Sequence, residues 1–247
     1  MANRTTQPRA TKAERKEQAR RERIELQRKM ARTRRNRRIF VAIVAVVAVG
    51  ATVFLLTRPE PVRASPGALL AAAEQATADA GCTEVEDIGP YEPRNIDRQH
   101  VPSEGTPPLS TYPTTPPASG PHNEITLGAG VYRSPPPIER MLHSLEHGAA
   151  IVWYAPGVAD EELERLETFY EGAEGARVIV APYDYPDQGE AGSLPAGSDM
   201  ALVAWHRLQT CAQVSLPVAF SFTADYSAPP FGQRPYLGEA PEAGAAF

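Results

Sequence analysis

The stretch PPPIERMLHSLEHGAAIVWYAP, residues 135–156, decides the fold class. Prolines at its start and Gly148 near its middle bracket apolar residues at helical spacing, which predicts a helix over residues 135–148. The following AAIVWYAP is an uninterrupted apolar run with β-branched residues, which predicts a buried strand. A helix that leads directly into a buried strand indicates a domain in which both element types share one core.

The alternation continues towards the C-terminus. Four further segments have the pattern of a helix, two strands and a last helix: ADEELERLETFYEG (159–172, with Asp160 as its cap), ARVIVAP (176–182), MALVAWHR (200–207) and AQVSLPVAFSFTADY (212–226). We therefore expect an α+β fold at residues 80–230, with a small three- to four-stranded sheet and flanking helices. Residues 231–247 are expected to form a Pro/Gly-rich tail.

Two different segments precede this region. SPGALLAAAEQATADAGC, residues 65–82, has a Ser-Pro start and a glycine stop, which predicts a helix within a stalk at 58–80. Residues 83–136 are rich in proline and show little periodicity. An irregular stretch of this length in a folded domain is unusual unless it has a function or is held in place.

Residues 39–57 contain no charged side chain and consist mostly of Val, Ala, Ile, Leu and Phe. Their number is close to the roughly 20 apolar residues that cross a bilayer as a helix. We predict one transmembrane helix here. A cleaved secretory signal ending near Ala64 is the alternative, although such signals have a shorter apolar region and a shorter basic start.

The net charge of −5 conceals two opposite halves. Residues 1–38 carry fifteen Lys or Arg and four Glu, whereas the remaining chain is strongly acidic. The positive flank predicts a cytoplasmic N-terminus and an extracytoplasmic C-terminal domain, so the protein is expected in the cell membrane as a single-pass protein. Residues 1–38 are expected to form a basic cytoplasmic arm, helical or disordered, of which residues 11–38 contact anionic lipid headgroups. No motif indicates a nucleic-acid partner.

Cys82 and Cys211 are the two cysteines of the chain, and both follow the predicted span. Two thiols in an oxidising compartment predict one disulfide bond. It would close a loop of about 130 residues and stabilise the domain by roughly 4 kcal/mol on the chain-entropy estimate.

Four of the five histidines fall within 48 residues: His100, His122, His143 and His147. His143 and His147 are four residues apart, so on a helix they share one face, as the two ligands of a metal pair do. The two loop histidines could join them, which predicts a copper or zinc site made of four imidazoles. Glu139 and Glu146 lie on the same face and are expected to orient the rings from the second shell.

Two alternatives stay open for this histidine cluster. A helix face with His and Glu is commonly just a solvated face, and the domain would then be a metal-free interaction module. The string HSLEH (143–147) also matches the inverted zinc-peptidase motif, which would make Glu146 the general base of a hydrolase. That motif needs a further carboxylate ligand downstream on a helix, whereas Glu190 lies in a loop and residues 200–224 contain no Asp or Glu. His206 is a doubtful additional ligand.

Four motifs stand out along residues 80–226: HVP (100–102), PPASGPH (116–122), GVY (130–132) and LHSLEHGAAIVWY (142–154). Over about this range the chain resembles one bacterial, mainly actinobacterial, family, domain of unknown function 3105. The resemblance implies a membrane anchor at the N-terminus and a single extracytoplasmic domain, but no established activity. It adds weight to eight positions: His100, Ser119, Gly120, His122, His143, Glu146, His147 and Gly148. His206 departs from the family pattern, which has glycine after the tryptophan.

Overall fold

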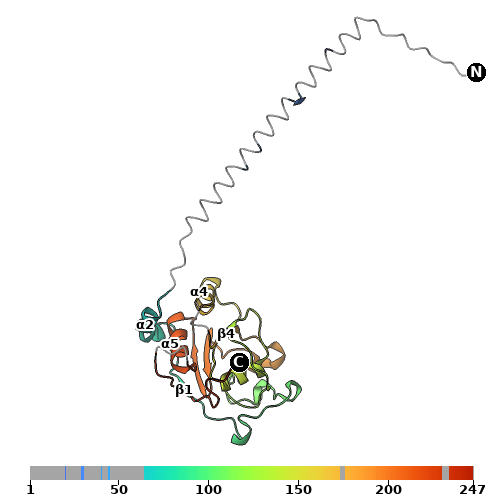
Figure 1. Cartoon of the computed structure of the whole chain (residues 1–247), viewed down its shortest axis with the longest axis vertical. Coiled ribbons are helices and arrows are strands. Elements are labelled where there is room, and N and C mark those ends of the chain that lie inside the picture. Colours follow the sequence, from blue (N-terminus) through green and yellow to red (C-terminus); the bar gives the residue numbers. More distant parts are fainter. Residues whose placement is uncertain are drawn as a thin grey trace, which may run out of the picture. The chain divides into compact units, whose positions relative to one another are not determined.

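The computed structural model describes residues 64–172, 176–229 and 234–246, with five single residues nearer the N-terminus: Arg20, Lys29, Met30, Phe40 and Val44. Apart from these single residues, the predicted arm (1–38) and span (39–57) lie outside the described residues. Among those described, no helix is both long enough and apolar enough to cross a membrane. The chain divides into two units, residues 1–62 and 63–247, and the second is the folded domain (Figure 1).

The domain combines helices and strands in the order that the sequence predicts around residues 135–226. Its α-helices are α2 (Pro66–Asp79), α3 (Ile138–Glu146), α4 (Asp160–Tyr170) and α5 (Leu216–Tyr226). Its strands are β1 (Glu86–Asp87), β2 (Gly130–Val131), β3 (Ala150–Tyr154), β4 (Val178–Pro182), β5 (Met200–Ala204) and β6 (Arg207–Cys211). Short 3-10 turns lie at Arg94–Ile96, Ser103–Gly105, Leu109–Thr111 and Pro186–Gly192. The fold is α+β, as predicted.

The strands form one mixed sheet in the order β1-β6-β5-β3-β4-β2. β3 lies parallel to β4, which in turn lies parallel to β2, whereas β3, β5, β6 and β1 are antiparallel neighbours. The predicted three- to four-stranded sheet was therefore too small. The strands β1 and β2 have two residues each, which is too short for any periodicity to be visible in the sequence.

The strand β6 was missed for a different reason. Its sequence RLQTC is half polar, and it begins after a two-residue turn within the segment that we predicted as a single strand, 200–207. His206 in that turn has φ +59°. This left-handed conformation is uncommon for residues other than glycine and occurs in tight hairpin turns. The helix predicted at residues 159–172 with Asp160 as its cap corresponds to α4. Asp160 is instead the first residue of this helix, and Ala159 occupies the cap position.

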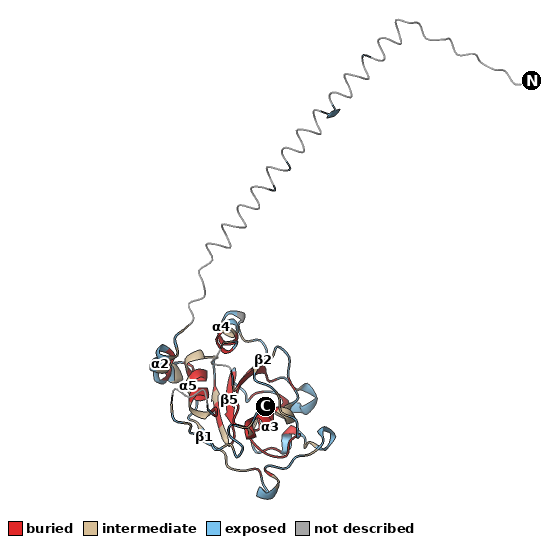
Figure 2. Ribbon diagram, viewed as in Figure 1, coloured by how far each residue is buried: buried red, intermediate tan, exposed pale blue. Residues whose placement is uncertain are grey.

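Alternate residues of the strands point to opposite faces of the sheet, and each face has its own hydrophobic core. On one face Val152, Val180 and Leu202 pack with α4, α5 and α2. On the other, Ile151 and Trp153 pack with α3 and the proline-rich segment. Figure 2 shows α3 and α5 separated by the buried strands.

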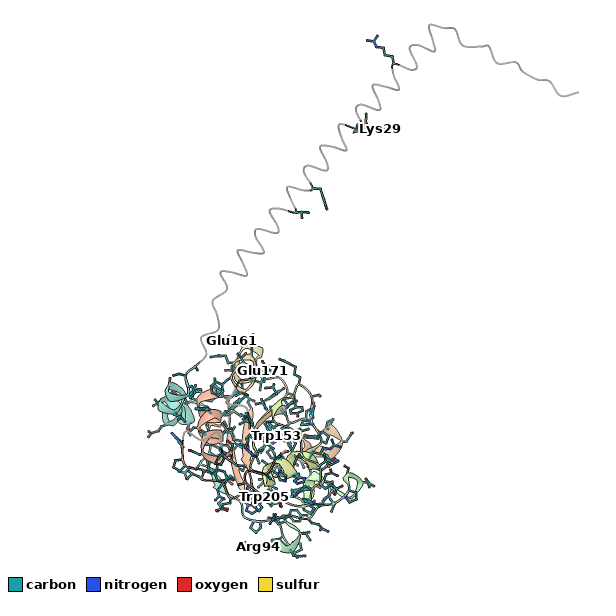
Figure 3. All side chains as sticks on the ribbon, in the orientation of Figure 1. Lys29, Arg94, Trp153, Glu161, Glu171 and Trp205 are labelled. Atoms are coloured by element: carbon teal, nitrogen blue, oxygen red, sulfur yellow. A yellow bond between two sulfur atoms is a disulfide. The ribbon has the colours of Figure 1, made fainter. Side chains whose placement is uncertain are left out.

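The second core explains the position of α3. Met141, Leu142 and Leu145 form the apolar face of the helix, as predicted, and are completely or almost completely buried against the sheet. Trp153 and Trp205 lie in the same core and are labelled inside the domain in Figure 3. The opposite face of α3 therefore turns towards the proline-rich segment.

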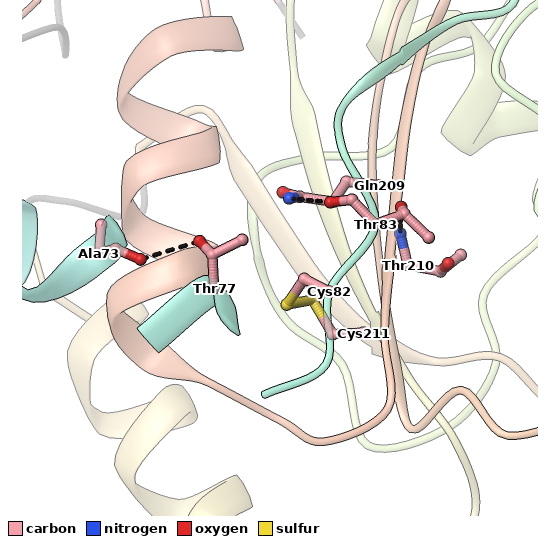
Figure 4. Close-up of a disulfide and its surroundings, with 7 residues drawn as sticks. All are labelled: Ala73, Thr77, Cys82, Thr83, Gln209, Thr210 and Cys211. Carbon is pink, nitrogen blue, oxygen red and sulfur yellow. Dashed lines mark hydrogen bonds between the residues drawn. A yellow bond between two sulfur atoms is a disulfide. The ribbon is translucent and has the colours of Figure 1, made fainter. Parts of the chain in front are cut away.

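The helix α2 belongs to the folded domain and does not act as a stalk. Leu69 is buried in the core that includes α5, and Figure 1 shows the two helices side by side. The Ser65 hydroxyl accepts a hydrogen bond from the Ala68 N–H and caps the helix. The predicted disulfide between Cys82 and Cys211 is present and joins the segment after α2 to the end of β6 (Figure 4).

The course of the proline-rich segment depends on Gly120. This residue has φ +117°, and a β-carbon at its position would lie 2.7 Å from the Tyr91 ring and 2.8 Å from the Tyr112 ring. The Tyr112 hydroxyl donates a hydrogen bond to the carbonyl of the next residue, Pro121 (2.6 Å). Two tyrosine rings therefore hold this turn, and no other residue type fits there without strain.

We expect Gly120→Ala to lower the free energy of unfolding by about 1–3 kcal/mol, because it adds both backbone strain and a steric clash. Chemical denaturation of the purified protein measures this change. Gly128→Ala is the matched control, since Gly128 lies in the same segment with no atom within 4 Å of an added β-carbon. Equal stability of the two variants would contradict this account of the turn.

Candidate metal centre

Four side chains converge between the proline-rich segment and α3. The possible ligand atoms of His100, His122, His143 and Glu146 all lie within 4.8 Å of one another. The imidazole ring centroids are 4.6 Å apart for His100 and His143, 4.9 Å for His100 and His122, and 5.0 Å for His122 and His143. We call these four residues the metal group, because three imidazoles and a carboxylate are typical ligands of transition metals.

Main-chain hydrogen bonds bring the two loop histidines side by side. His100 and His122 form a parallel β-bridge, although 21 residues separate them in the sequence. The Val101 N–H donates to the His122 carbonyl (2.7 Å), and the His122 N–H donates to the Gln99 carbonyl (3.0 Å). The proline-rich segment thus folds into a defined structure that delivers both rings to α3.

The histidine face of α3 is buried, which corrects the view of it as a solvated face. The segment 83–136 covers Glu146 and His143 almost completely, while His100 keeps 45% of its side chain exposed. The Nδ1 atom of His143 is buried, and the described residues offer it no hydrogen-bond partner. A buried polar atom without a partner is costly, and a bound metal ion would satisfy it.

Both ring nitrogens of His122 lie close to oxygen atoms of the protein. Its Nδ1 lies 2.8 Å from the Gly120 carbonyl, and its Nε2 lies 3.0 Å from Oε2 of Glu146. Both neighbours are hydrogen-bond acceptors, whereas a neutral imidazole has only one N–H. A neutral ring can therefore donate to only one of these acceptors, and a cation shared with Glu146 through Nε2 would satisfy the other. A ligating histidine whose other nitrogen donates to a backbone carbonyl is the usual arrangement in metal sites.

The carboxylate of Glu146 is 1% exposed and is surrounded by cationic or polar donors. Nε of Arg98 donates to Oε1, and Nε2 of His100 lies 3.4 Å from Oε2, which also faces His122. Burial by itself would raise the pKa of Glu146, but the hydrogen bonds from His122 and Arg98 outweigh it and lower the pKa to about 2. Glu146 is therefore an anion at neutral pH.

His143 is held in its neutral form. Burial, together with the neighbouring rings of His122, His147 and His100, lowers the pKa of His143 to about 4. Metal ions bind neutral imidazole and compete with protons for it. A histidine with this pKa offers its lone pair at neutral and mildly acidic pH without first losing a proton.

The structure changes the roles expected for two residues of α3 and its C-terminus. Glu146, expected in the second shell, lies in the metal group, whereas His147 does not. The His147 ring contacts His143 with a centroid distance of 4.6 Å, but Nε2 of His147 faces Glu242 (3.3 Å) and Nδ1 lies 2.7 Å from the Ala246 carbonyl. The set of imidazoles is therefore three, completed by a carboxylate.

Glu139, the other expected second-shell residue, does not take that position. Its backbone carbonyl accepts a hydrogen bond from Asn123, but among the described residues its carboxylate bonds to no histidine. Glu139 lies in the first turn of α3, whereas Glu146 ends the helix at the metal group. The sequence pattern places both glutamates on the histidine face of the helix, so it could not show which of them contacts the histidines.

Two residues that contact Glu146 were not predicted from the sequence. Arg98 donates to Glu146 and, through Nη2, to Glu242 (2.8 Å). The Glu242 N–H donates to the Glu146 carbonyl (3.0 Å), so the C-terminal tail lies against the metal group and is not a separate segment. Nothing in the sequence pattern signals either residue, because a lone arginine in a loop and a glutamate about 100 residues downstream are ordinary surface features.

His206 lies beside the metal group and not in it. Nε2 of His206 is 2.9 Å from Oδ2 of Asp97, and the ring contacts Trp205, which packs edge-on against His122. Oδ1 of Asp97 accepts a hydrogen bond from the Tyr91 N–H (2.6 Å). This pair ties the β5–β6 turn to the proline-rich segment, which is a positioning role.

Comparison with known proteins agrees with the motifs in this region. The family described as protein of unknown function DUF3105 matches residues 108–242, which include His122, α3 and Glu242. The chain belongs to the DUF3105 family. Neither a curated protein nor a solved structure matches it. His100 and Arg98 lie just before the matched residues, although they contact the DUF3105 region directly.

The geometry also bears on the hydrolase alternative for this DUF3105 domain. A general base works best when its pKa is near the operating pH and its carboxylate reaches a metal-bound water. Glu146 has a pKa of about 2, and both of its oxygens face partners of this chain. Neither oxygen of Glu146 is therefore free to accept a proton from a water molecule in this arrangement.

The Asp97–His206 pair predicts a pH-dependent contribution to stability. Burial by itself would raise the pKa of Asp97, but hydrogen bonds from His206 and the Tyr91 N–H outweigh it, so this pKa is lowered from 3.8. The stabilisation is complete above about pH 3.8 and decreases as the pH falls through the lower pKa of the folded state. Asp97→Asn should therefore destabilise most at neutral pH, and its difference from wild type should shrink below pH 3.8. Urea denaturation at several pH values measures this, and a constant difference would contradict it.

Proposed function

We propose that this DUF3105 protein binds one transition-metal ion through His100, His122, His143 and Glu146. The position of the His122 ring carries the proposal, since it lies between the Gly120 carbonyl and the Glu146 carboxylate with an acceptor at each nitrogen. A metal ion between Nε2 and Oε2 would satisfy both atoms with a neutral ring. The unpartnered Nδ1 of His143 supports the same assignment.

The ligand types favour zinc first and copper(II) second. Three imidazole nitrogens and one carboxylate oxygen suit a borderline divalent ion, whereas copper(I) prefers thiolate and thioether ligands. Both cysteines form the disulfide, and Met141 and Met200 are completely buried in the hydrophobic cores. No soft ligand is therefore within the group.

Four protein ligands favour a structural or metal-handling role over catalysis. The ion would connect the proline-rich segment, which supplies two histidines, to α3, which supplies the other two ligands. This is the connection that an irregular segment of such length needs in order to stay folded. The exposed side of His100 offers a route by which the ion could enter or leave.

Elemental analysis of the purified full-length protein tests the proposal. Wild type and Glu139→Gln should contain about one equivalent of zinc or copper, because among the described residues the Glu139 carboxylate bonds to no histidine of the group. His122→Ala/His143→Ala should contain none, and Glu146→Gln should bind the metal at least about tenfold more weakly. A chelator should lower the melting temperature of wild type but not that of the double variant.

Two other results would contradict the proposal. A wild-type protein that takes up no metal after dialysis against zinc and copper would indicate a metal-free interaction module. A Glu146→Gln variant that keeps full metal affinity but loses a hydrolytic activity of the wild type would instead identify Glu146 as a general base.

We also propose that the protein is anchored in the cell membrane by residues 39–57, with residues 11–38 at the cytoplasmic lipid surface and the metal group outside. The uncharged run and its arginine-rich N-terminal flank support this orientation, and the disulfide is consistent with an oxidising compartment. Protease added to intact cells should digest the domain and spare an N-terminal tag. Protection of the domain from the protease would contradict this orientation.

A further inference from the structure

A second cluster of polar side chains lies next to the metal group. The carboxylate of Glu242, in the C-terminal tail, is shared between Arg98 and His147. Its Oε1 accepts a hydrogen bond from Nη2 of Arg98 (2.8 Å), and its Oε2 lies 3.3 Å from Nε2 of His147. One carboxylate thus spans a guanidinium and an imidazole, each of which contacts a different oxygen.

Other contacts of the domain hold both partners in place. Arg98 also donates to Glu146 through Nε, which fixes the guanidinium while Nη2 contacts Glu242. His147 is the C-cap residue of α3, and the Ala246 carbonyl is 2.7 Å from Nδ1 of its ring, so that Nε2 turns towards Glu242. Both groups are therefore positioned by interactions that do not involve the Glu242 side chain.

The Glu242 side chain can leave this position at little cost. Side-chain exposure is 42% for Glu242 and 49% for Arg98, and exposed ion pairs contribute little to stability. The backbone N–H of Glu242 is bonded to the Glu146 carbonyl. A rotation of the side chain alone would therefore free Arg98 and His147 while the main chain of the tail stays in place.

We propose that Arg98 and His147 form a binding subsite for the carboxylate of an external ligand, and that Glu242 is its internal, displaceable occupant. The observed occupant defines the chemical class, because one planar carboxylate places one oxygen at Nη2 of Arg98 and the other at Nε2 of His147. The subsite itself does not require a metal. If the proposed metal is bound, a ligand held here lies beside the centre, because Arg98 also donates to Glu146 and the His147 ring contacts the His143 ring.

Titration with sodium acetate tests the subsite. The full-length protein, with ¹⁵N-labelled histidine, is followed by NMR through the His147 ring signal, at ionic strength kept constant with sodium chloride. Glu242→Gln should bind acetate at least about fivefold more tightly than wild type, because removal of an internal competitor raises the fraction of open sites. Glu239→Gln is the matched control: Glu239 lies in the same tail but pairs with Arg207 at 2.8 Å, and this variant should behave as wild type.

The acetate titration tests the subsite independently of metal binding. It is carried out on metal-free and on zinc-treated protein. A protein that fails to bind zinc contradicts the proposed function, but its acetate affinity still tests the subsite. Equal acetate affinity in Glu242→Gln and wild type, or the same shift with chloride alone, would overturn the subsite. The external carboxylate could belong to a small free acid or to a protein side chain. A second titration with N-acetylglutamate amide, which resembles a glutamate side chain in a protein, separates these sources. An affinity equal to that of acetate indicates free acids, and a higher affinity than that of acetate indicates protein side chains.

Discussion

A buried carboxylate is the constraint on which the site depends. Glu146 is almost inaccessible to solvent, and a buried charge is tolerated only when partners of opposite charge or suitable donors surround it. Those partners come from a segment more than twenty residues upstream: Arg98, His100 and His122 all face its two oxygens. The same carboxylate therefore organises the proline-rich segment and creates the group of ligands that a metal ion would use.

The sheet places this carboxylate where the segment can reach it. Because Met141, Leu142 and Leu145 are buried against the sheet, the opposite face of α3 is directed outward, and the proline-rich segment closes over it. The turn at Gly120 and the Asp97–His206 pair hold the segment in that position. A domain with few regular elements can thus present three imidazoles in a defined arrangement.

The prediction of the site from sequence was good where the signal was local. The spacing of His143 and His147 predicted a polar helix face, and the concentration of histidines predicted convergence with His100 and His122. Helical periodicity cannot determine which member of such a face turns inward at a helix end. For that reason the sequence does not indicate that Glu146 lies among the histidine rings while His147 faces Glu242. Arg98 and Glu242 were missed because their contacts span 48 and 144 residues of the chain.

The sequence by itself determined the α+β class, the helix that precedes the buried strand, the disulfide pairing and membership of the DUF3105 family. These properties follow from periodicity, from turn residues and from the number of cysteines, all of which can be read along the chain. Only the tertiary structure decided the six-stranded sheet, the composition of the metal group and the position of the tail against it. These features depend on two-residue strands and on contacts between distant side chains, and neither leaves a periodic pattern in the sequence.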